Sequence, residues 1–125
     1  RAPAYCVATG KALLAWREES PTSLLTVRPL QTFTRSTLAD TSALAIELER
    51  VRQQGYAINR GEWRPSVWGI AAPIFDGRSR VVAAIGISGP AARIRARGLK
   101  RLSEQVVQAA RQASVLPAAA LGQAG

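Results

Sequence analysis

Two apolar runs separated by a short turn-forming cluster constrain this sequence more than any other feature. The first run covers residues 70–75 and the second covers residues 81–90, with Asp76-Gly77-Arg78-Ser79 between them. Asp, Gly and Ser are typical of hairpin turns, so the pattern predicts an antiparallel β-hairpin. A four-residue loop would pair Phe75 with Arg80 and would fix the register of both strands.

This register gives the hairpin one bulky face and one bare face, because side chains alternate between the two faces of a strand. The bulky face receives the pairs Trp68–Ile87, Ile70–Ile85, Ala72–Ala83 and Ile74–Val81. The bare face receives Val67–Ser88, Gly69–Gly86, Ala71–Ala84 and Pro73–Val82. Glycine within a strand often marks close approach by a ligand or another backbone. The bare face therefore indicates either the floor of a pocket or a surface on which helices or a second sheet pack tightly.

Helical patterns flank the hairpin. Residues 12–16 suggest a first helix with Thr9 as its N-cap. A second helix is predicted after Asp40, which can cap it, and Gly55 fits its C-terminal cap. Its apolar stripe consists of Leu44, Leu48 and Val51. A single last helix is expected after Gly89-Pro90. Its apolar positions are Ile94, Leu102, Val106 and either Ala109 or Ala110.

This order of elements predicts an α+β fold in which helices cover one face of an antiparallel sheet. The chain has 125 residues, of which 47% are apolar and 20% charged, as expected for one folded domain. We expect residues 115–125 to form a flexible C-terminal tail. Gly, Pro, Arg or Asp interrupts each apolar run well before about 18 residues, so we expect no membrane association and a cytoplasmic location.

The composition disfavours the usual enzyme chemistries. Cys6 is the single cysteine and histidine is absent, so the commonest general base and the commonest zinc-binding nitrogen are missing. Cys6 has no neighbouring base in the sequence, and a buried structural cysteine is favoured over a nucleophile. We expect no enzymatic activity, no cofactor and no metal.

A strong positive charge raises nucleic-acid binding as an alternative function. The chain carries 17 Lys and Arg against 8 Asp and Glu, a net charge of +9. Five cations fall within nine residues that contain no acid: Arg93, Arg95, Arg97, Lys100 and Arg101. No aromatic residues alternate with them and no groove-reading motif is present, so a solvated arginine-rich helix face is favoured over a basic nucleic-acid-binding module.

Five motifs in order resemble those of a known family. The segment Cys6-Val7-Ala8-Thr9-Gly10-Lys11-Ala12-Leu13-Leu14-Ala15 resembles a pocket-loop signature, and Thr34-Arg35-Ser36-Thr37 resembles a Thr-x-x-Thr connector. A helix ending in Gly55-Tyr56-Ala57 follows, then Gly69-Ile70-Ala71-Ala72-Pro73-Ile74 and Gly86-Ile87-Ser88-Gly89-Pro90-Ala91-Ala92-Arg93. From Arg1 to Ser114 the chain resembles the effector-binding domain of IclR-type bacterial transcriptional regulators.

The resemblance implies a GAF-like sensor that binds a small metabolite, often an organic or aromatic acid, and signals to a winged helix-turn-helix domain. It implies a homo-oligomer, a dimer or tetramer. Residues 1–114 would form an N-terminally incomplete sensor domain, and DNA would be bound only through a domain absent from this chain. The ligand-binding positions that it assigns are Ala8, Thr9, Gly10, Asn59, Val67, Gly69, Gly86 and Ser88.

The chain departs from the family pattern at three of these positions. Gly69 stands where many relatives carry cysteine, Gly86 where serine is frequent, and Asn59 where an acid is common. These changes enlarge the expected cavity and favour a partly apolar carboxylate over a two-carbon acid. Ser88 and the main-chain amides of residues 8–10 remain as donors.

Two further side chains near this predicted pocket leave alternatives open. Lys11 could act as a counter-ion for a bound carboxylate or could face solvent in the first helical turn. Trp63 lies in the polar turn between strands and could cap the pocket, whereas Trp68 is expected in the core under a helix.

Overall fold

The structure, a computed structural model, describes residues 3–17 and 30–115. The elements in chain order are η1 (Ala4–Cys6), α1 (Ala8–Leu14), α3 (Thr41–Gln54), β1 (Ala57–Arg60), β2 (Val67–Phe75), β3 (Val81–Pro90), α4 (Ala91–Arg97) and α5 (Leu99–Val115). The predicted tail, beyond residue 115, lies outside the described residues. None of the helices within the described residues has the length and apolarity of a membrane-spanning segment.

The three strands form an antiparallel sheet in the order β1-β2-β3. The predicted hairpin of β2 and β3 is confirmed, but its predicted register is wrong by two residues. Phe75 pairs with Val81, and a bulge between Ile74 and Phe75 then pairs Ile74 with Ala83. The loop contains one residue more than expected, and Ser79 within it adopts a left-handed φ of 61°. The bulge inserts a second extra residue, and together the two account for the register difference.

A register shift of two residues keeps the side chains of residues 67–74 and 83–90 on their predicted faces, whereas Val81, beyond the bulge, pairs with Phe75 instead of Ile74. The bulky and bare faces are therefore as predicted, although the partners across them differ. Gly69 pairs with Ser88 and Ala71 pairs with Gly86, so the two glycines lie diagonally rather than directly opposite.

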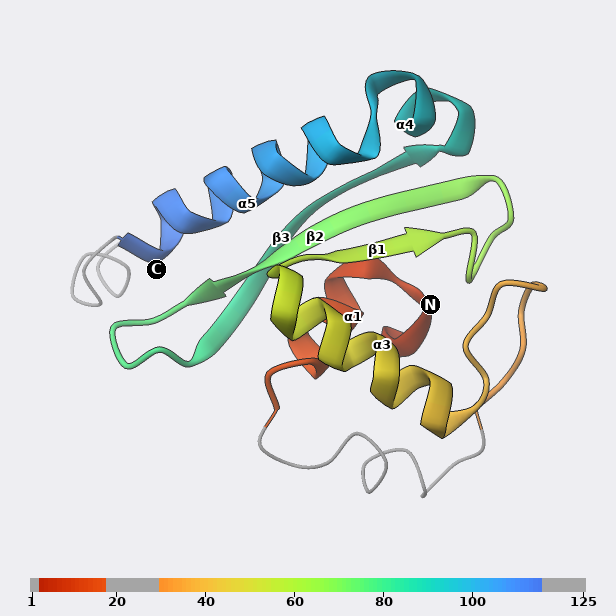
Figure 1. Cartoon of the computed structure of the whole chain (residues 1–125), viewed down its shortest axis with the longest axis horizontal. Coiled ribbons are helices and arrows are strands. Elements are labelled where there is room, and N and C mark those ends of the chain that lie inside the picture. Colours follow the sequence, from red (N-terminus) through yellow and green to blue (C-terminus); the bar gives the residue numbers. More distant parts are fainter. Residues whose placement is uncertain (1–2, 18–29, 116–125) are drawn as a thin grey trace.

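Helices cover both faces of the sheet, which corrects the expectation of one covered face (Figure 1). On the bulky face, Ile70 and Ala72 pack against residues of α4 and α5. On the bare face, Ala57 and Ala71 pack against η1, α1 and α3. The small residues of the bare face allow α1 to approach the sheet closely, so part of that surface is a packing surface.

Helix α3 forms as predicted. The Asp40 carboxylate accepts a hydrogen bond of 2.9 Å from the Ser42 N–H, and Gly55 ends the helix with a left-handed φ of 87°. The predicted stripe is fully buried, and consists of Leu44, Leu48 and Val51. Helix α1 differs from its prediction, because it begins at Ala8 and Val7 occupies its N-cap without a side-chain hydrogen bond. Thr9 is therefore not the cap.

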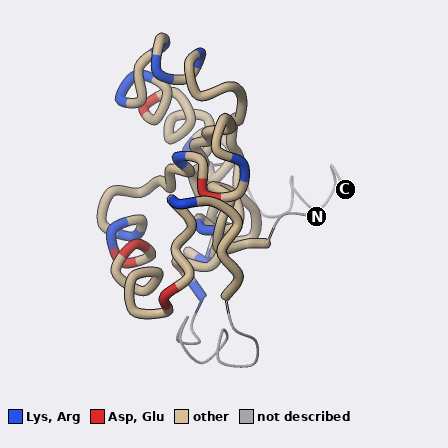
Figure 2. Tube along the Cα trace, turned by 90° about the vertical axis from the view of Figure 1, so that its right-hand side faces the viewer, with Lys and Arg blue, Asp and Glu red and all other residues tan. Residues whose placement is uncertain are grey.

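The single last helix that was expected is divided at Gly98 into α4 and α5. Gly98 has a left-handed φ of 91°, and its N–H donates to the carbonyls of Ile94 and Arg95. The predicted apolar positions are buried, with Ala110 rather than Ala109 in the core. Basic residues gather at this end of the molecule, at the top of Figure 2, and the Arg95 guanidinium lies 5.3 Å from the centre of the Trp68 ring.

Candidate functional site

A cavity of about 330 Å³ lies between the start of α1 and the bare face of the sheet. Seven of the eight predicted ligand-binding residues line it: Ala8, Thr9, Asn59, Val67, Gly69, Gly86 and Ser88. Val7, Trp63 and Ile87 complete its lining. Sequence reasoning had suggested Trp63 as a cap but had missed Val7 and Ile87. Val7 directly precedes two predicted residues, and this adjacency could have indicated it.

Three residues form one row across the floor of this cavity. Asn59 on β1 pairs with Gly69 on β2, which pairs with Ser88 on β3. Because paired residues of an antiparallel sheet share a face, an amide and a hydroxyl stand on either side of a glycine. The corrected register therefore brings Ser88 level with Asn59, an arrangement that the predicted pairing of Ser88 with Val67 did not give.

Gly10 is the predicted residue that does not line the cavity. A Cβ atom at this position would lie 2.3 Å from the carbonyl oxygen of Ala4 and 2.5 Å from its Cα atom. These distances are far below van der Waals contact, so only glycine allows α1 to lie against η1. Gly10 thus has a packing role, and we propose no ligand contact for its Cα.

Gly86 lines the cavity and also permits close contact between strands. A Cβ atom built there would lie 2.7 Å from the Ile70 carbonyl oxygen and 2.9 Å from the Ala71 Cβ atom. At Gly69 the corresponding atom would lie 3.3 Å from the Ile87 carbonyl oxygen, which is tight but less severe. The absence of a side chain at Gly86 is therefore a requirement of the sheet itself.

Lys11 is fully buried and forms an ion pair, which corrects both alternatives suggested by the sequence. Its Nζ atom lies 2.9 Å from Glu62 Oε2 and 3.0 Å from Oε1, and 3.6 Å from Glu47 Oε2. It also donates to the Ile58 carbonyl oxygen at 2.5 Å. Lys11 does not line the cavity, so it is neither a direct counter-ion nor a solvent-facing residue. Burial of a charge requires such pairing.

The loop between β1 and β2 carries Glu62 and is held from a second direction by the Thr-x-x-Thr segment. The Thr34 hydroxyl donates to the Gly61 carbonyl oxygen at 2.5 Å, and the Thr37 hydroxyl donates to the Glu62 carbonyl oxygen. Thr37 Oγ1 also accepts the Thr34 N–H at 2.9 Å. This connector therefore fixes the main chain of the loop that leads from Asn59 to the cavity wall.

The Asn59 side chain is only 5% exposed, and the loop between β1 and β2 determines the orientation of its carboxamide. Its Oδ1 atom accepts a hydrogen bond of 2.8 Å from the Glu62 N–H. The carboxamide NH2 has no hydrogen-bond partner among the residues that the structure describes. Every fully buried side-chain nitrogen or oxygen of those residues does have a partner, so this NH2 group is not fully buried. The NH2 group is therefore accessible to solvent, and the Asn59 side chain lines the cavity.

Cys6 lies under the pocket loop as a buried thiol. Its pKa is raised from 9.0 to about 11, mainly by burial and to a smaller extent by the Glu62 carboxylate, while Lys11 opposes the shift. Its sulfur donates to the Pro3 carbonyl oxygen at 3.3 Å. A thiol with this pKa is protonated at neutral pH, which agrees with a structural cysteine rather than a nucleophile. In residues 3–17 and 30–115 no group of three or more potential ligands could hold a metal ion.

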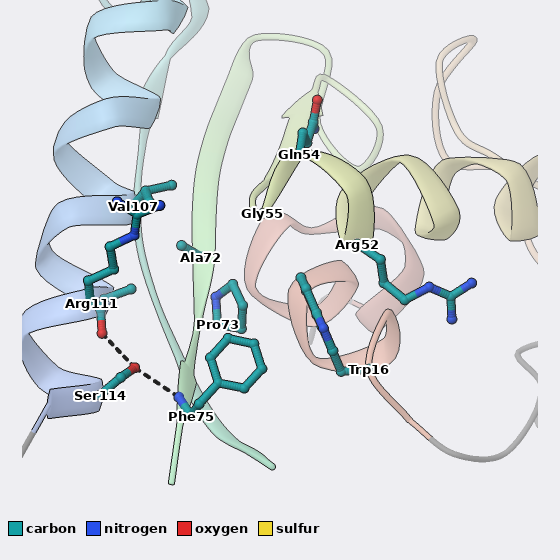
Figure 3. A pocket seen from close by; sticks show the side chains of 11 residues that line it. Trp16, Arg52, Gln54, Gly55, Ala72, Pro73, Phe75, Val107, Arg111 and Ser114 are labelled. Atoms are coloured by element: carbon teal, nitrogen blue, oxygen red, sulfur yellow. Dashed lines mark hydrogen bonds between the residues drawn. The ribbon is translucent and has the colours of Figure 1, made fainter. Parts of the chain in front are cut away.

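A second, larger cavity of about 630 Å³ lies beside the end of β2 (Figure 3). Trp16 and Phe75 stand edge to face there, with ring centres 5.7 Å apart. Ser114 closes one side, accepting the Phe75 N–H at 2.9 Å and donating to a carbonyl of α5 at 2.8 Å. Arg52 at its rim is engaged by Glu49 and by the Ala15 carbonyl. None of the predicted residues lines this cavity, and we assign the candidate site to the smaller one.

The fold and the smaller cavity define an α+β sensor domain of the kind that the motifs resemble. Comparison with known proteins gives the family. Residues 1–115 match the family described as "Bacterial transcriptional regulator IclR C-terminal". The chain therefore belongs to the IclR family of bacterial transcriptional regulators and corresponds to their effector-binding domain.

The chain is similar to regulators from several bacteria. It is 38% identical over 115 residues to the HTH-type transcriptional regulator BhcR of Paracoccus denitrificans, covering 91% of the chain and 41% of that protein. It is 37% identical over 110 residues to the HTH-type transcriptional regulator XynR of Escherichia coli, covering 87% and 44%. The chain thus spans less than half the length of both relatives.

A solved structure supports the same assignment. The crystal structure of the C-terminal domain of the E. coli transcriptional regulator KdgR superposes with a TM-score of 0.81 at 35% identity, covering 91% of this chain and 70% of that one. The fold, including the antiparallel sheet with helices, is therefore that of this domain family.

Proposed function

We propose that this domain binds a small organic or aromatic carboxylate in the cavity beneath α1, and that binding controls DNA binding by a separate helix-turn-helix domain. The observation that carries the proposal is the convergence of seven residues, expected from the family resemblance, around one cavity. The names of BhcR and XynR as HTH-type regulators support the link to DNA.

The chemistry of the lining supports a partly apolar anion. Polar groups are supplied by the Asn59 NH2 and by the hydroxyls of Thr9 and Ser88, whereas Val7, Val67 and Trp63 supply apolar surface. Ligand sites commonly combine a mostly apolar wall with a few oriented polar groups. Neutral donors can bind a carboxylate without a counter-ion, since a hydrogen bond to a charged group contributes about 1.5 to 3 kcal/mol.

The size of the cavity favours a ligand larger than a two-carbon acid. At about 330 Å³ it lies within the range of small-molecule sites, roughly 300 to 1,000 Å³. Benzoate is a suitable first probe, because its ring can contact Trp63 and Val67 while its carboxylate meets the donors.

A thermal-shift and calorimetric panel tests the proposal, comparing acetate, pyruvate and benzoate with benzamide as an uncharged control. A ligand at about 100 times its dissociation constant stabilises the folded domain by about 2.7 kcal/mol, which is readily detected as a rise in melting temperature. We expect benzoate to stabilise the domain more than acetate does. If no carboxylate in the panel stabilises it, the proposed ligand class is wrong.

A matched pair of variants ties binding to this cavity. Val67→Phe places a ring into it, whereas Val82→Phe makes the same change on β3 at a position that is 56% exposed and outside the lining. We expect the first variant to lose the benzoate response and the second to keep it. Equal responses from both would place the ligand elsewhere.

The regulatory half of the proposal needs a full-length protein that contains the helix-turn-helix domain. The effector should change its affinity for operator DNA, measured at fixed salt because phosphate contacts depend on ionic strength. The present domain alone should show no sequence preference among DNA duplexes. A sequence-specific complex with this domain alone would favour the basic nucleic-acid-binding alternative.

A further inference from the structure

We propose that the buried Lys11–Glu62 ion pair holds Asn59 so that its carboxamide NH2 is offered to the effector, and that the site therefore selects a ligand with an acceptor oxygen at this wall. The inference rests on the proposed function, because it concerns the same cavity. Lys11 and Glu62 act here as positioning residues, and Asn59 as a specificity-determining residue.

The ion pair joins two walls of the cavity. Lys11 belongs to α1, whose first residues Ala8 and Thr9 line the cavity, and Glu62 belongs to the loop after β1. Both Glu62 carboxylate oxygens lie within 3.0 Å of the Lys11 Nζ atom. The Glu62 side chain is 7% exposed and that of Lys11 is fully buried, so solvent does not compete for the contact.

The position of Glu62 in turn determines which group Asn59 presents. The Glu62 N–H donates to Asn59 Oδ1 at 2.8 Å, and Glu62 Oε2 accepts the Arg60 N–H at 3.2 Å. A flipped Asn59 would place its NH2 group against the Glu62 N–H, which would leave two donors facing each other. The oxygen is therefore fixed on the loop side, and the NH2 group remains for the cavity.

Among the described residues, the Thr connector binds the loop only through two carbonyls. The loop should therefore stay folded without the ion pair, whereas the direction of the Glu62 N–H would no longer be fixed through the Glu62 side chain. Thr34 and Thr37 bind the carbonyls of Gly61 and Glu62 and would remain if both charges were removed. Removing one charge leaves the other buried and unpaired, whereas removing both can be nearly neutral for stability. Glu47, which lies 3.6 Å from the Lys11 Nζ atom, would lose its partner but is 23% exposed and so remains in contact with water. The double variant Lys11→Met, Glu62→Gln thus tests positioning in a domain that still folds.

The first experiment needs no ligand. The side-chain amide of Asn59 is observed by ¹⁵N NMR and assigned with Asn59→Ser. In the wild type we expect the two NH2 proton resonances to lie away from their positions in an unfolded chain, and in the double variant we expect them to move toward those positions as the amide loses its fixed orientation. The matched control, Arg52→Met with Glu49→Gln, removes an exposed ion pair with side chains 40% and 52% exposed and should leave the Asn59 resonances unchanged. Unchanged Asn59 resonances in a folded double variant would overturn the positioning role.

The second experiment measures benzoate affinity by calorimetry. Asn59→Asp keeps an oxygen acceptor for the Glu62 N–H but replaces the donor NH2 with an anionic oxygen. We expect its affinity for benzoate to fall by about tenfold or more, the loss expected for one hydrogen bond to a charged group, with circular dichroism confirming that the variant is folded. The double variant Lys11→Met, Glu62→Gln should lose benzoate affinity to a similar extent. The control Arg52→Met, Glu49→Gln should keep the wild-type affinity.

The outcomes separate this inference from the proposed function. If Asn59→Asp binds benzoate as tightly as the wild type does, the donor assignment is wrong even though the cavity binds carboxylates. If the wild type binds none of the panel, the proposed function and the acceptor-ligand selection both fail, while the NMR comparison still decides whether the ion pair orients Asn59.

Discussion

Gly86→Ala is expected to destabilise the domain even though Gly86 lines a cavity. The added methyl group would lie 2.7 Å from the Ile70 carbonyl oxygen and 2.9 Å from the Ala71 Cβ atom, both on β2. Neither atom can move without displacing the backbone that pairs with β3. Gly69→Ala is the matched comparison, because its methyl group would lie 3.3 Å from the Ile87 carbonyl oxygen and 3.6 Å from the Ala8 and Ser88 side chains.

The magnitude follows from two opposing terms. Overpacking of this kind costs about 1 to 3 kcal/mol, and the smaller conformational freedom of alanine in the unfolded chain offsets about 0.4 to 1 kcal/mol. The middle values of these ranges, about 2 and about 0.7 kcal/mol, differ by about 1.3 kcal/mol, which is the loss of unfolding free energy expected for Gly86→Ala. Gly69→Ala should stay within about 0.5 kcal/mol of the wild type, since its closest contact requires only a small adjustment of the neighbouring strand.

Urea denaturation followed by circular dichroism measures both changes. A lower midpoint with an unchanged slope would show that stability has changed while the surface exposed on unfolding has not. The argument is refuted if Gly86→Ala is as stable as the wild type, or if Gly69→Ala is the more damaging of the two. Either result would mean that β2 and β3 are not in close contact at Gly86.

Three further predictions concern pH and assembly. The pKa of Cys6 is raised in the folded domain, to about 11 from 9.0, so the unfolded chain loses the thiol proton first as pH rises. The free energy of unfolding should therefore fall as pH rises above 9. Urea midpoints measured at pH 8 and 10 should show a smaller fall for Cys6→Ala than for the wild type. Strand β3 is an edge of the sheet within the described residues, and its Ile85 and Ile87 are 38% and 42% exposed. Because an exposed apolar edge strand favours association, sedimentation at micromolar concentration should show a dimer or tetramer. A clean monomer would contradict this expectation. Replacing Arg97 and Arg101 by Gln should leave benzoate binding unchanged but weaken assembly, mainly at low salt; normal assembly with higher stability at low salt would show that the arginines only repel each other.

The faces of the hairpin could be predicted from the sequence, but its register could not. Alternation of side chains depends only on the extended backbone and survives any even shift. Register depends on loop length and on bulges, and neither the left-handed conformation of Ser79 nor the bulge at Ile74 and Phe75 has a distinctive local signal. Gly86 illustrates this, because two directly opposed glycines would leave room for a side chain there, whereas the observed register places Ala71 opposite Gly86 and its Cβ atom 2.9 Å from an added Cβ.

The lining of the candidate site was predictable because short family motifs carry most of it, whereas the ion pair behind it was not. Lys11 and Glu62 lie 51 residues apart, and their contact exists only after α1 packs on the bare face. Glu62 offered one usable signal. It is one of only eight acids in a basic chain and stands between Gly61 and Trp63 in a tight turn, where an acid without a partner would have no evident role.

The bare face was interpreted as either a pocket floor or a packing surface, and the structure shows that one depends on the other. Ala71 and Ala57 are fully buried under η1, α1 and α3, and this packing places the start of α1 above the row formed by Asn59, Gly69 and Ser88. Because Gly69 has no side chain, the space between the amide and the hydroxyl stays open. In the proposed complex, a carboxylate would meet donors from both outer strands, and the rest of the ligand would extend toward Val67 and Trp63. If the proposal holds, the outer strands would determine which polar head binds, and the size of residue 69 would determine how closely that head approaches the sheet.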